Sequence, residues 1–171
     1  MSTTIMYDII NKAVFLGLNG CEPWKNFKNV KFICPSPGYE KHFKICNTFG
    51  IKMLPVKIYN NGPDMDIIEK MVLEDETIKG IWCVPLYSNP TRAIYSDEVV
   101  KRLAAMKTKA HDFTILWDNA YCVHHLTDEI ITIKNIIREC EKYGNPDRVF
   151  EFASTSKITF PGGRSSCMFI K

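Results

Sequence analysis

Three polar residues of the types that take part in catalysis each stand directly after an apolar run of strand length. Asn89 in "YSNPT" follows "GIWCVP", Asp118 in "WDNAY" follows "FTILW", and Lys157 in "STSK" follows "RVFEFA". In open α/β sheets, ligands bind beyond the carboxyl ends of the strands. If these strands are parallel, the amide, the carboxylate and the amine converge on one edge of a sheet.

Each of these residues taken alone also has a structural interpretation. Asn-Pro is a common turn dipeptide, an aspartate after a strand often caps the next turn, and Lys157 suits a solvated loop. Tyr121, in the same "WDNAY" segment as Asp118, is typical of a half-buried packing aromatic. The order and the strand-end placement of all four residues favour a shared site.

The chemistry that needs this set is pyridoxal-phosphate (PLP) catalysis. A lysine amine that loses its proton in a partly desolvated site forms the Schiff base with the cofactor aldehyde. A carboxylate facing the pyridine nitrogen keeps that nitrogen protonated, so that the ring accepts electrons from the substrate. A phenol and an amide tune the imine from the 3-oxygen, and hydroxyls with an arginine hold the phosphate.

Short apolar runs and helix-period segments alternate along the chain, which predicts βαβ units. Runs of strand length lie at residues 30–34, 52–58, 80–85, 113–117, 148–153 and 166–170. Their near-continuous apolar character is typical of strands that are buried on both faces. The predicted fold class is therefore α/β, with a mainly parallel sheet between two helical layers.

Four segments have helical periodicity, at residues 3–18, 62–76, 95–106 and 128–144. We expect Ser96 to cap the third and Gly144 to end the fourth. Pro63 and Asp64 are expected in the first turn of the second helix. The apolar spacing predicts buried faces made by two sets of residues: Ile5, Ile9, Ala13 and Leu16 in the first helix, and Ile67, Met71 and Leu73 in the second.

Composition places the chain among ordinary globular proteins. It has 171 residues, 46% hydrophobic and 24% charged, with a net charge of +3 that favours solvated faces over a nucleic-acid surface. No apolar run is long enough to span a membrane. Seven cysteines without a C-x-x-C pair indicate free thiols in a reducing, cytoplasmic compartment. The adjacent His124 and His125 have no partner at ligand spacing, so we expect no metal.

Read together, the phrases "YSNPT", "WDNAY" and "STSK" resemble the fold-type I PLP-dependent aminotransferases. "PGYEKHF", "GIWCVPLYSNPT" and "FASTSKITFPG" are most similar to the aspartate aminotransferases related to the MocR group. The resemblance implies a three-layer large domain, PLP as cofactor, transfer of an amino group from an amino acid such as aspartate to a 2-oxo acid, and a homodimer. It covers nearly the whole chain.

Carried over by position, the resemblance assigns roles to eight residues. It makes Lys157 the Schiff-base lysine and Asp118 the partner of the pyridine nitrogen. Asn89 and Tyr121 would contact the 3-oxygen of the cofactor ring, and Tyr39 would cover the face of the ring. The phosphate ligands would be the hydroxyls of Ser154 and Ser156 together with Arg164.

The sequence departs from the family pattern at two positions and in length. Arg92 stands where the family usually has the glycine of Asn-Pro-Thr-Gly, so a positive φ there would strain the loop. Arg164 lies seven residues past Lys157, whereas the phosphate arginine of many relatives lies eight past its lysine. Family members are roughly twice as long or more, so residues 1–171 are expected to form the central part of the large domain, without the N-terminal arm and the C-terminal small domain.

Two alternatives to a catalytic chain stay open. One is a truncated module that binds PLP without transamination, or a regulatory module of the MocR type. The other is a folded remnant whose cofactor contacts are incomplete, which Arg92 and the position of Arg164 favour.

Overall fold

A computed structural model describes residues 2–123, 130–155 and 165–169. In this part of the chain the strands form a seven-stranded sheet, and their order across it is β3-β2-β1-β4-β5-β6-β7. The bounds are β1 Lys31–Ser36, β2 Lys52–Tyr59, β3 Gly62–Pro63, β4 Ile78–Cys83, β5 Thr114–Asp118, β6 Val149–Ser154 and β7 Ser166–Phe169.

The sheet is parallel through its centre and antiparallel at both ends. β1 pairs in parallel with β2 and with β4, β4 pairs with β5, and β5 pairs with β6. The short β3 and the last strand β7 are antiparallel to their neighbours β2 and β6. The predicted mainly parallel sheet is confirmed, and the carboxyl ends of β1, β4, β5 and β6 therefore share one edge.

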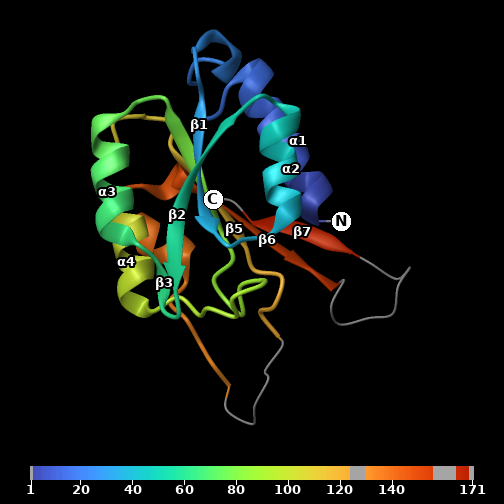
Figure 1. The fold of residues 1–171 in the computed structure, drawn as a ribbon, viewed down its shortest axis with the longest axis vertical. Coiled ribbons are helices and arrows are strands. Elements are labelled where there is room, and N and C mark those ends of the chain that lie inside the picture. The colour runs from blue at the N-terminus through green and yellow to red at the C-terminus, as the bar shows by residue number, and fades with distance from the viewer. Residues whose placement is uncertain (1, 124–129, 156–164, 170–171) are drawn as a thin grey trace.

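Helices cover both faces of the sheet, as predicted. α1 (Ser2–Leu16) and α2 (Glu40–Thr48) lie on one face, and α3 (Met65–Glu74) and α4 (Asp97–Ala105) lie on the other (Figure 1). α5 (Ile136–Lys142) packs beside α4, because Ile136 and Cys140 belong to the same buried cluster as residues of that helix. None of the described helices is long and apolar enough to cross a membrane.

The central strands contribute side chains to two separate cores. On β5, Ile115 and Trp117 pack under α3 and α4, whereas Leu116 packs under α1 and α2. Side chains of a strand alternate between its faces, so a strand buried on both faces must be apolar at consecutive positions. All residues of β4 and β5 are buried, which explains their continuous apolar runs.

The helix boundaries partly follow the sequence signals. The Ser96 hydroxyl accepts from the Val99 amide and caps α4, and Gly144 has φ +76° just past α5, both as predicted. Asp64 is the N-cap of α3, so Pro63 lies before the helix in β3 and not in its first turn.

Three predictions about helices are wrong. Leu16, Ile67 and Leu73 were predicted to be buried but are exposed by 73%, 47% and 57%. Ala13 is buried as predicted, and Ile5, Ile9 and Met71 are partly buried against the two cores. The buried positions that the spacing did not predict are Met6 and Ile10 in α1 and Met65, Ile68 and Val72 in α3. Apolar residues occur on both sides of these helices, so their spacing did not determine the phase. The predicted helix at 128–144 begins only at residue 136, where the Asn135 side chain caps it, and α2 was not predicted as a helix.

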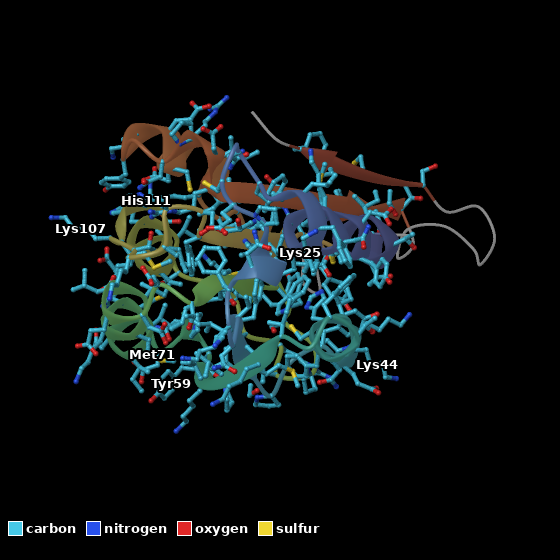
Figure 2. The ribbon with its side chains drawn as sticks, turned by 90° about the horizontal axis from the view of Figure 1, so that it is seen from above. Lys25, Lys44, Tyr59, Met71, Lys107 and His111 are labelled. Atoms are coloured by element: carbon cyan, nitrogen blue, oxygen red, sulfur yellow. The ribbon has the colours of Figure 1, made fainter. Side chains whose placement is uncertain are left out.

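The basic cluster "KNFKNVK" is mostly a solvated surface. Lys25 and Lys28 are exposed, and Lys31 forms an ion pair with Asp75 at 2.6 Å. Other lysines, such as Lys44 and Lys107, also extend from the surface (Figure 2).

Candidate active site

The carboxyl edge of the sheet contains the point where the strand order reverses. From β1 the chain passes outward to β2, and it returns to place β4 on the other side of β1, next to β5. In doubly wound sheets, ligands bind in the crevice outside such a switch point. A small cleft lies there, bordered by residues that follow β1 and β4, among them Tyr39, His42 and Ser88.

Asp118 is the last residue of β5 and reaches this edge with a buried carboxylate. The residue is only 4% exposed. One oxygen, Oδ2, lies 3.0 Å from Nε2 of His42, and the other, Oδ1, is buried without a hydrogen-bond partner in the described part of the chain. A buried carboxylate oxygen without a donor is costly in a folded protein, so Oδ1 fits the N–H group of a ligand.

His42 comes from α2, and its ring is enclosed by aromatic side chains. The residue is 1% exposed, and its imidazole stacks on the indole of Trp82 at 4.4 Å with an interplanar angle of 9°. Tyr39, the N-cap residue of α2, meets the imidazole edge-on at 5.1 Å. The sequence analysis did not identify His42, although it stands three residues after Tyr39 and therefore on the same side of a helix.

The segment after β5 is tied to the neighbouring strand β6. The Asn119 amide N–H donates to the carbonyl of Phe152, and its side chain donates to Glu151 at 2.8 Å. Burial raises the pKa of Glu151, against the opposing effect of the Asn119 hydrogen bond. These bonds fix the direction in which the chain leaves Asp118.

The structure brings four of the other predicted site residues to this edge. Tyr39 lies beside His42, Tyr121 is half-buried in the turn after β5, and Ser154 is buried at the end of β6. Asn89 lies in the loop after β4 and is exposed.

The other three predicted residues, Ser156, Lys157 and Arg164, lie outside the described residues, as do His124 and His125. Thr155 and Ser165, which flank residues 156–164, are hydrogen-bonded to each other. The Thr155 amide donates to the Ser165 carbonyl, and the Ser165 amide donates to the Thr155 hydroxyl, both at 2.9 Å. Both flanks therefore lie together at the carboxyl end of β6.

The loop between β4 and α4 contains the residue that replaces the family's glycine. Arg92 has φ +61°, and its amide donates to the carbonyl of Ser88. Tyr87 in the same loop has φ +50°. The positive φ that would strain the loop at Arg92 is therefore present, since residues other than glycine rarely adopt this backbone conformation.

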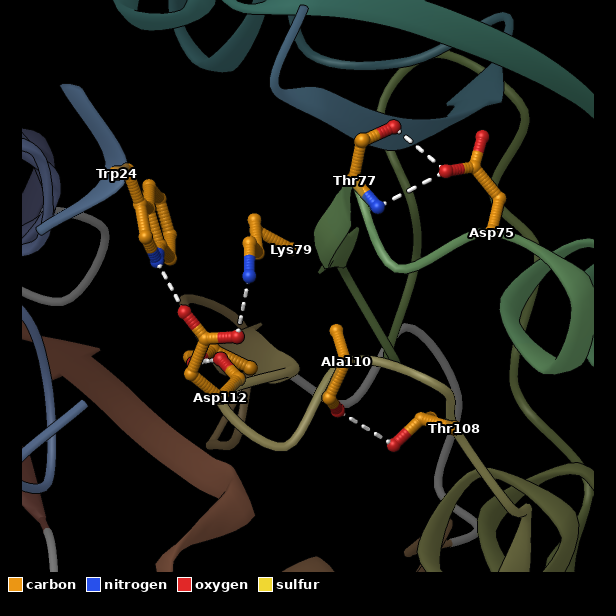
Figure 3. Close-up of polar contacts among 8 residues, drawn as sticks. Trp24, Asp75, Thr77, Lys79, Thr108, Ala110 and Asp112 are labelled. Atoms are coloured by element: carbon orange, nitrogen blue, oxygen red, sulfur yellow. Dashed lines mark hydrogen bonds and ion pairs between the residues drawn. The ribbon is translucent and has the colours of Figure 1, made fainter. Parts of the chain in front are cut away.

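The opposite, amino edge of the sheet has a polar cluster of another kind (Figure 3). Asp112, just before β5, is 5% exposed and accepts from Lys79 Nζ at Oδ1 and from Trp24 Nε1 at Oδ2, both at 2.7 Å. The Lys79 ammonium also lies 3.8 Å from the centre of the Phe27 ring. A cavity of about 270 Å³ adjoins this cluster.

In the described ranges, no group of three or more His, Cys, Asp or Glu residues has metal-site geometry. All seven cysteines are free thiols.

The fold and the site define a doubly wound α/β protein with a buried acceptor at its ligand-binding edge. A family model described as aspartate amino-transferase matches residues 1–169, so the chain belongs to this family. The family predicted from the sequence is confirmed.

Individual relatives agree with this assignment. A protein of Mycolicibacterium smegmatis provisionally named an aminotransferase is 51% identical over 162 residues, which are 94% of this chain and 38% of the relative. The crystal structure of an aspartate transaminase from Corynebacterium glutamicum has a TM-score of 0.95 and 45% identity, over 100% of this chain and 40% of the transaminase. The chain thus spans about two fifths of the length of these relatives.

More distant relatives agree in fold or match only weakly. The α-aminoadipate aminotransferase LysN of Thermus thermophilus, complexed with N-(5'-phosphopyridoxyl)-L-leucine, has a TM-score of 0.78 at 18% identity over 99% of this chain and 39% of LysN. An HTH-type transcriptional regulator of Bacillus subtilis is 28% identical over 70% of this chain and 24% of the regulator. The link to the MocR group is therefore weak.

Proposed function

We propose that this chain is the cofactor-binding part of a PLP-dependent aminotransferase that transfers the amino group of an amino acid, aspartate in the first instance, to a 2-oxo acid. The observation that carries this proposal is the unpaired, buried Oδ1 of Asp118 at the carboxyl edge of the sheet, one strand from the switch point. Family membership supports it, as does the aspartate transaminase of C. glutamicum.

When bound, PLP supplies a pyridine ring that takes up electrons while the amino group and the α-proton of the substrate move. Asp118 Oδ1 would accept a hydrogen bond from the ring N–H. Because a carboxylate only accepts hydrogen bonds, Nε2–H of His42 is the donor to Oδ2. With Oδ2 occupied in this way, Oδ1 is held in a fixed direction toward the cofactor.

Lys157 is proposed to provide the amine that bonds covalently to the cofactor aldehyde. In the sequence it stands two residues after Thr155, which lies at the carboxyl end of β6. Ser154, Ser156 and Arg164, in the same part of the sequence, are the proposed phosphate ligands.

The remaining proposed contacts come from the loops after β1, β4 and β5. Asn89 and Tyr121 are assigned to the 3-oxygen of the ring, where an amide and a phenol each offer a hydrogen bond. Tyr39 is assigned to the ring face, which agrees with its place against the His42 imidazole.

Covalent trapping tests this proposal. We expect added PLP to give a visible absorption band, and borohydride, which makes a lysine–cofactor bond permanent, to leave a pyridoxyl group on Lys157 in peptide mass maps. Lys157→Arg should abolish the band, whereas Lys142→Arg, a change at an exposed lysine, should leave it intact. Label spread evenly over surface lysines would overturn the proposal.

A second candidate is a module that binds PLP without turnover. The weak match to the transcriptional regulator favours it. The two candidates differ in one assay: a transaminase converts aspartate and 2-oxoglutarate, whereas the module labels at Lys157 but exchanges no amino group.

The family resemblance also implies a cytoplasmic homodimer, which we propose for the whole protein. The free state of all seven cysteines is compatible with a reducing compartment. Sedimentation equilibrium tests the dimer, which a monomer at micromolar concentration would contradict.

A further inference from the structure

Trp82, on the penultimate position of β4, contacts α2 at two successive turns. Its ring stacks face to face on His42, and its indole Nε1–H donates to Sγ of Cys46 at 3.3 Å. His42 and Cys46 are four residues apart, so they lie one above the other on the same side of the helix. One indole thus fixes both the height and the rotation of α2 over the sheet.

The three residues are enclosed in the core. Trp82, His42 and Cys46 are exposed by 3%, 1% and 1%. The ring of Phe32, on the neighbouring strand β1, packs against the indole with 5.5 Å between the ring centres. Trp82 therefore has little freedom to move away from His42, because densely packed neighbours surround it.

The stacking of Trp82 on His42 determines how the imidazole faces Asp118. An imidazole turns about its χ2 angle in a broad energy well, so packing from one side does not by itself aim its Nε2. The indole of Trp82 stacks on the imidazole with 4.4 Å between ring centres and an interplanar angle of 9°, so it defines the plane of the imidazole ring. The ring of Tyr39, perpendicular to the imidazole, restricts its movement in a second direction. In that plane Nε2 lies 3.0 Å from Asp118 Oδ2.

We propose that Trp82, anchored by Cys46, is a positioning residue of the cofactor site, which holds His42 in the plane from which Nε2 donates to Asp118. Trp82 acts through His42 and carries no charge of its own. The expected effect of Trp82 on PLP binding rests on the function proposed above. Its effect on the orientation of His42 does not require the cofactor.

The first test observes the His42 ring in the cofactor-free chain. With ¹⁵N-histidine labelling, the four histidines give few imidazole signals, and His42→Asn assigns the relevant one. We expect a slowly exchanging ring N–H in the wild-type chain. Trp82→Leu, which removes the stacked ring, should speed its exchange by about tenfold or more, the scale of one lost hydrogen bond.

The chain offers a matched control for this change. Trp24 is equally buried and also donates its indole N–H to a buried acceptor, Asp112, at the other edge of the sheet. Trp24→Phe and Trp82→Phe therefore remove the same chemical group. Only Trp82→Phe should alter the His42 signal. If both variants alter it equally, or neither does, Trp82 is merely a core residue and the proposal is wrong.

Cys46→Ala covers the case in which the tryptophan variants do not fold. It removes the anchor and leaves the indole and the imidazole in place, so we expect faster His42 exchange than in the wild type, though by less than for Trp82→Leu. An unchanged His42 signal in this variant overturns the anchoring role.

A second arm separates this inference from the proposed function. If PLP binds to the wild-type chain, Trp82→Phe should weaken its binding measurably more than Trp24→Phe does. If PLP does not bind at all while the His42 signal responds as expected, the proposed function fails and the positioning role stands. If PLP binds and Trp82→Phe leaves both readouts unchanged, the positioning role fails alone.

Discussion

Two buried aspartates stand at the two ends of β5, and they differ in what their oxygens contact. Asp112 and Asp118 are exposed by 5% and 4%. Both oxygens of Asp112 have partners within the chain, Lys79 and Trp24. Asp118 has one partner, His42, and its second oxygen has none among the described residues.

We interpret the difference as that between a structural carboxylate and one that is open to a ligand. Burying a charge is unfavourable unless it is paired, so the closed arrangement around Asp112 belongs to folding. In the function proposed above, a donor from the cofactor completes the open arrangement around Asp118. The same residue type, near the two ends of one strand and with nearly equal burial, thus has two different hydrogen-bond arrangements.

The largest expected effect is at the closed carboxylate. Asp112→Asn leaves the Lys79 ammonium buried without its counter-charge, and we expect a loss of about 3–5 kcal/mol in the free energy of unfolding. Urea denaturation measures it, with Asp147→Asn, a change at an exposed residue, as the control.

A double variant sharpens this expectation. Lys79→Met combined with Asp112→Leu removes both charges together, so it should recover much of the stability that either single change loses. If the double variant is as unstable as the sum of the two single variants, the ion pair does not explain the effect of Asp112.

A smaller effect is expected in the strained loop at the carboxyl edge. Arg92 adopts φ +61°, so Arg92→Gly should stabilise the chain by about 0.5–1 kcal/mol, as relief of strain exceeds the added freedom of the unfolded chain. Thermal unfolding checks this. Arg92→Ala keeps a Cβ at the same φ and should bring no such gain; an equal gain from alanine would show that φ is not the cause.

The smallest effect concerns a partly buried carboxylate at the amino edge, that of Asp75. Although burial opposes it, the hydrogen bonds from Lys31 and Thr77 lower the pKa of Asp75 from 3.8 to about 2. A lowered pKa stabilises the fold above pH 3.8, and this contribution is lost as the pH falls through about 2.

Lys31→Met should therefore reduce stability at pH 7 by only about 0.2–1 kcal/mol, because water screens the pair. The difference from wild type should shrink toward pH 2. Lys28→Met, at an exposed lysine of the same cluster, provides the control in urea denaturation over this pH range. A difference that grows as the pH falls would contradict the assignment.

The sequence predicted the elements whose signals are local. β4 and β5 were found because strands buried on both faces carry apolar residues at consecutive positions, here Ile81–Cys83 and Ile115–Trp117, and the parallel pairing then placed Asp118 at the carboxyl edge. The Ser96 cap was found because its signal spans four residues.

The sequence did not reveal the partners of Asp118, since they depend on how α2 docks. His42 and Asp118 are 76 positions apart, and no local pattern links them. α2 has only nine residues and a largely polar sequence, so its helical period was weak. Lys79 and Asp112 were missed for the same reason, because a lysine at the start of a strand normally reaches solvent.

The most direct test of the account compares the unfolding free energies of the wild-type chain and of Asp118→Asn, each with and without saturating PLP. Without PLP, Asp118→Asn should be as stable as the wild type or more stable, because a buried charge with one unpaired oxygen is removed while the asparagine oxygen can still accept from His42. With PLP, only the wild type should gain the full stabilisation that ligand binding confers. If Asp118→Asn without PLP loses as much stability as Asp112→Asn, or gains as much from PLP as the wild type, then Asp118 is not the open carboxylate of a cofactor site.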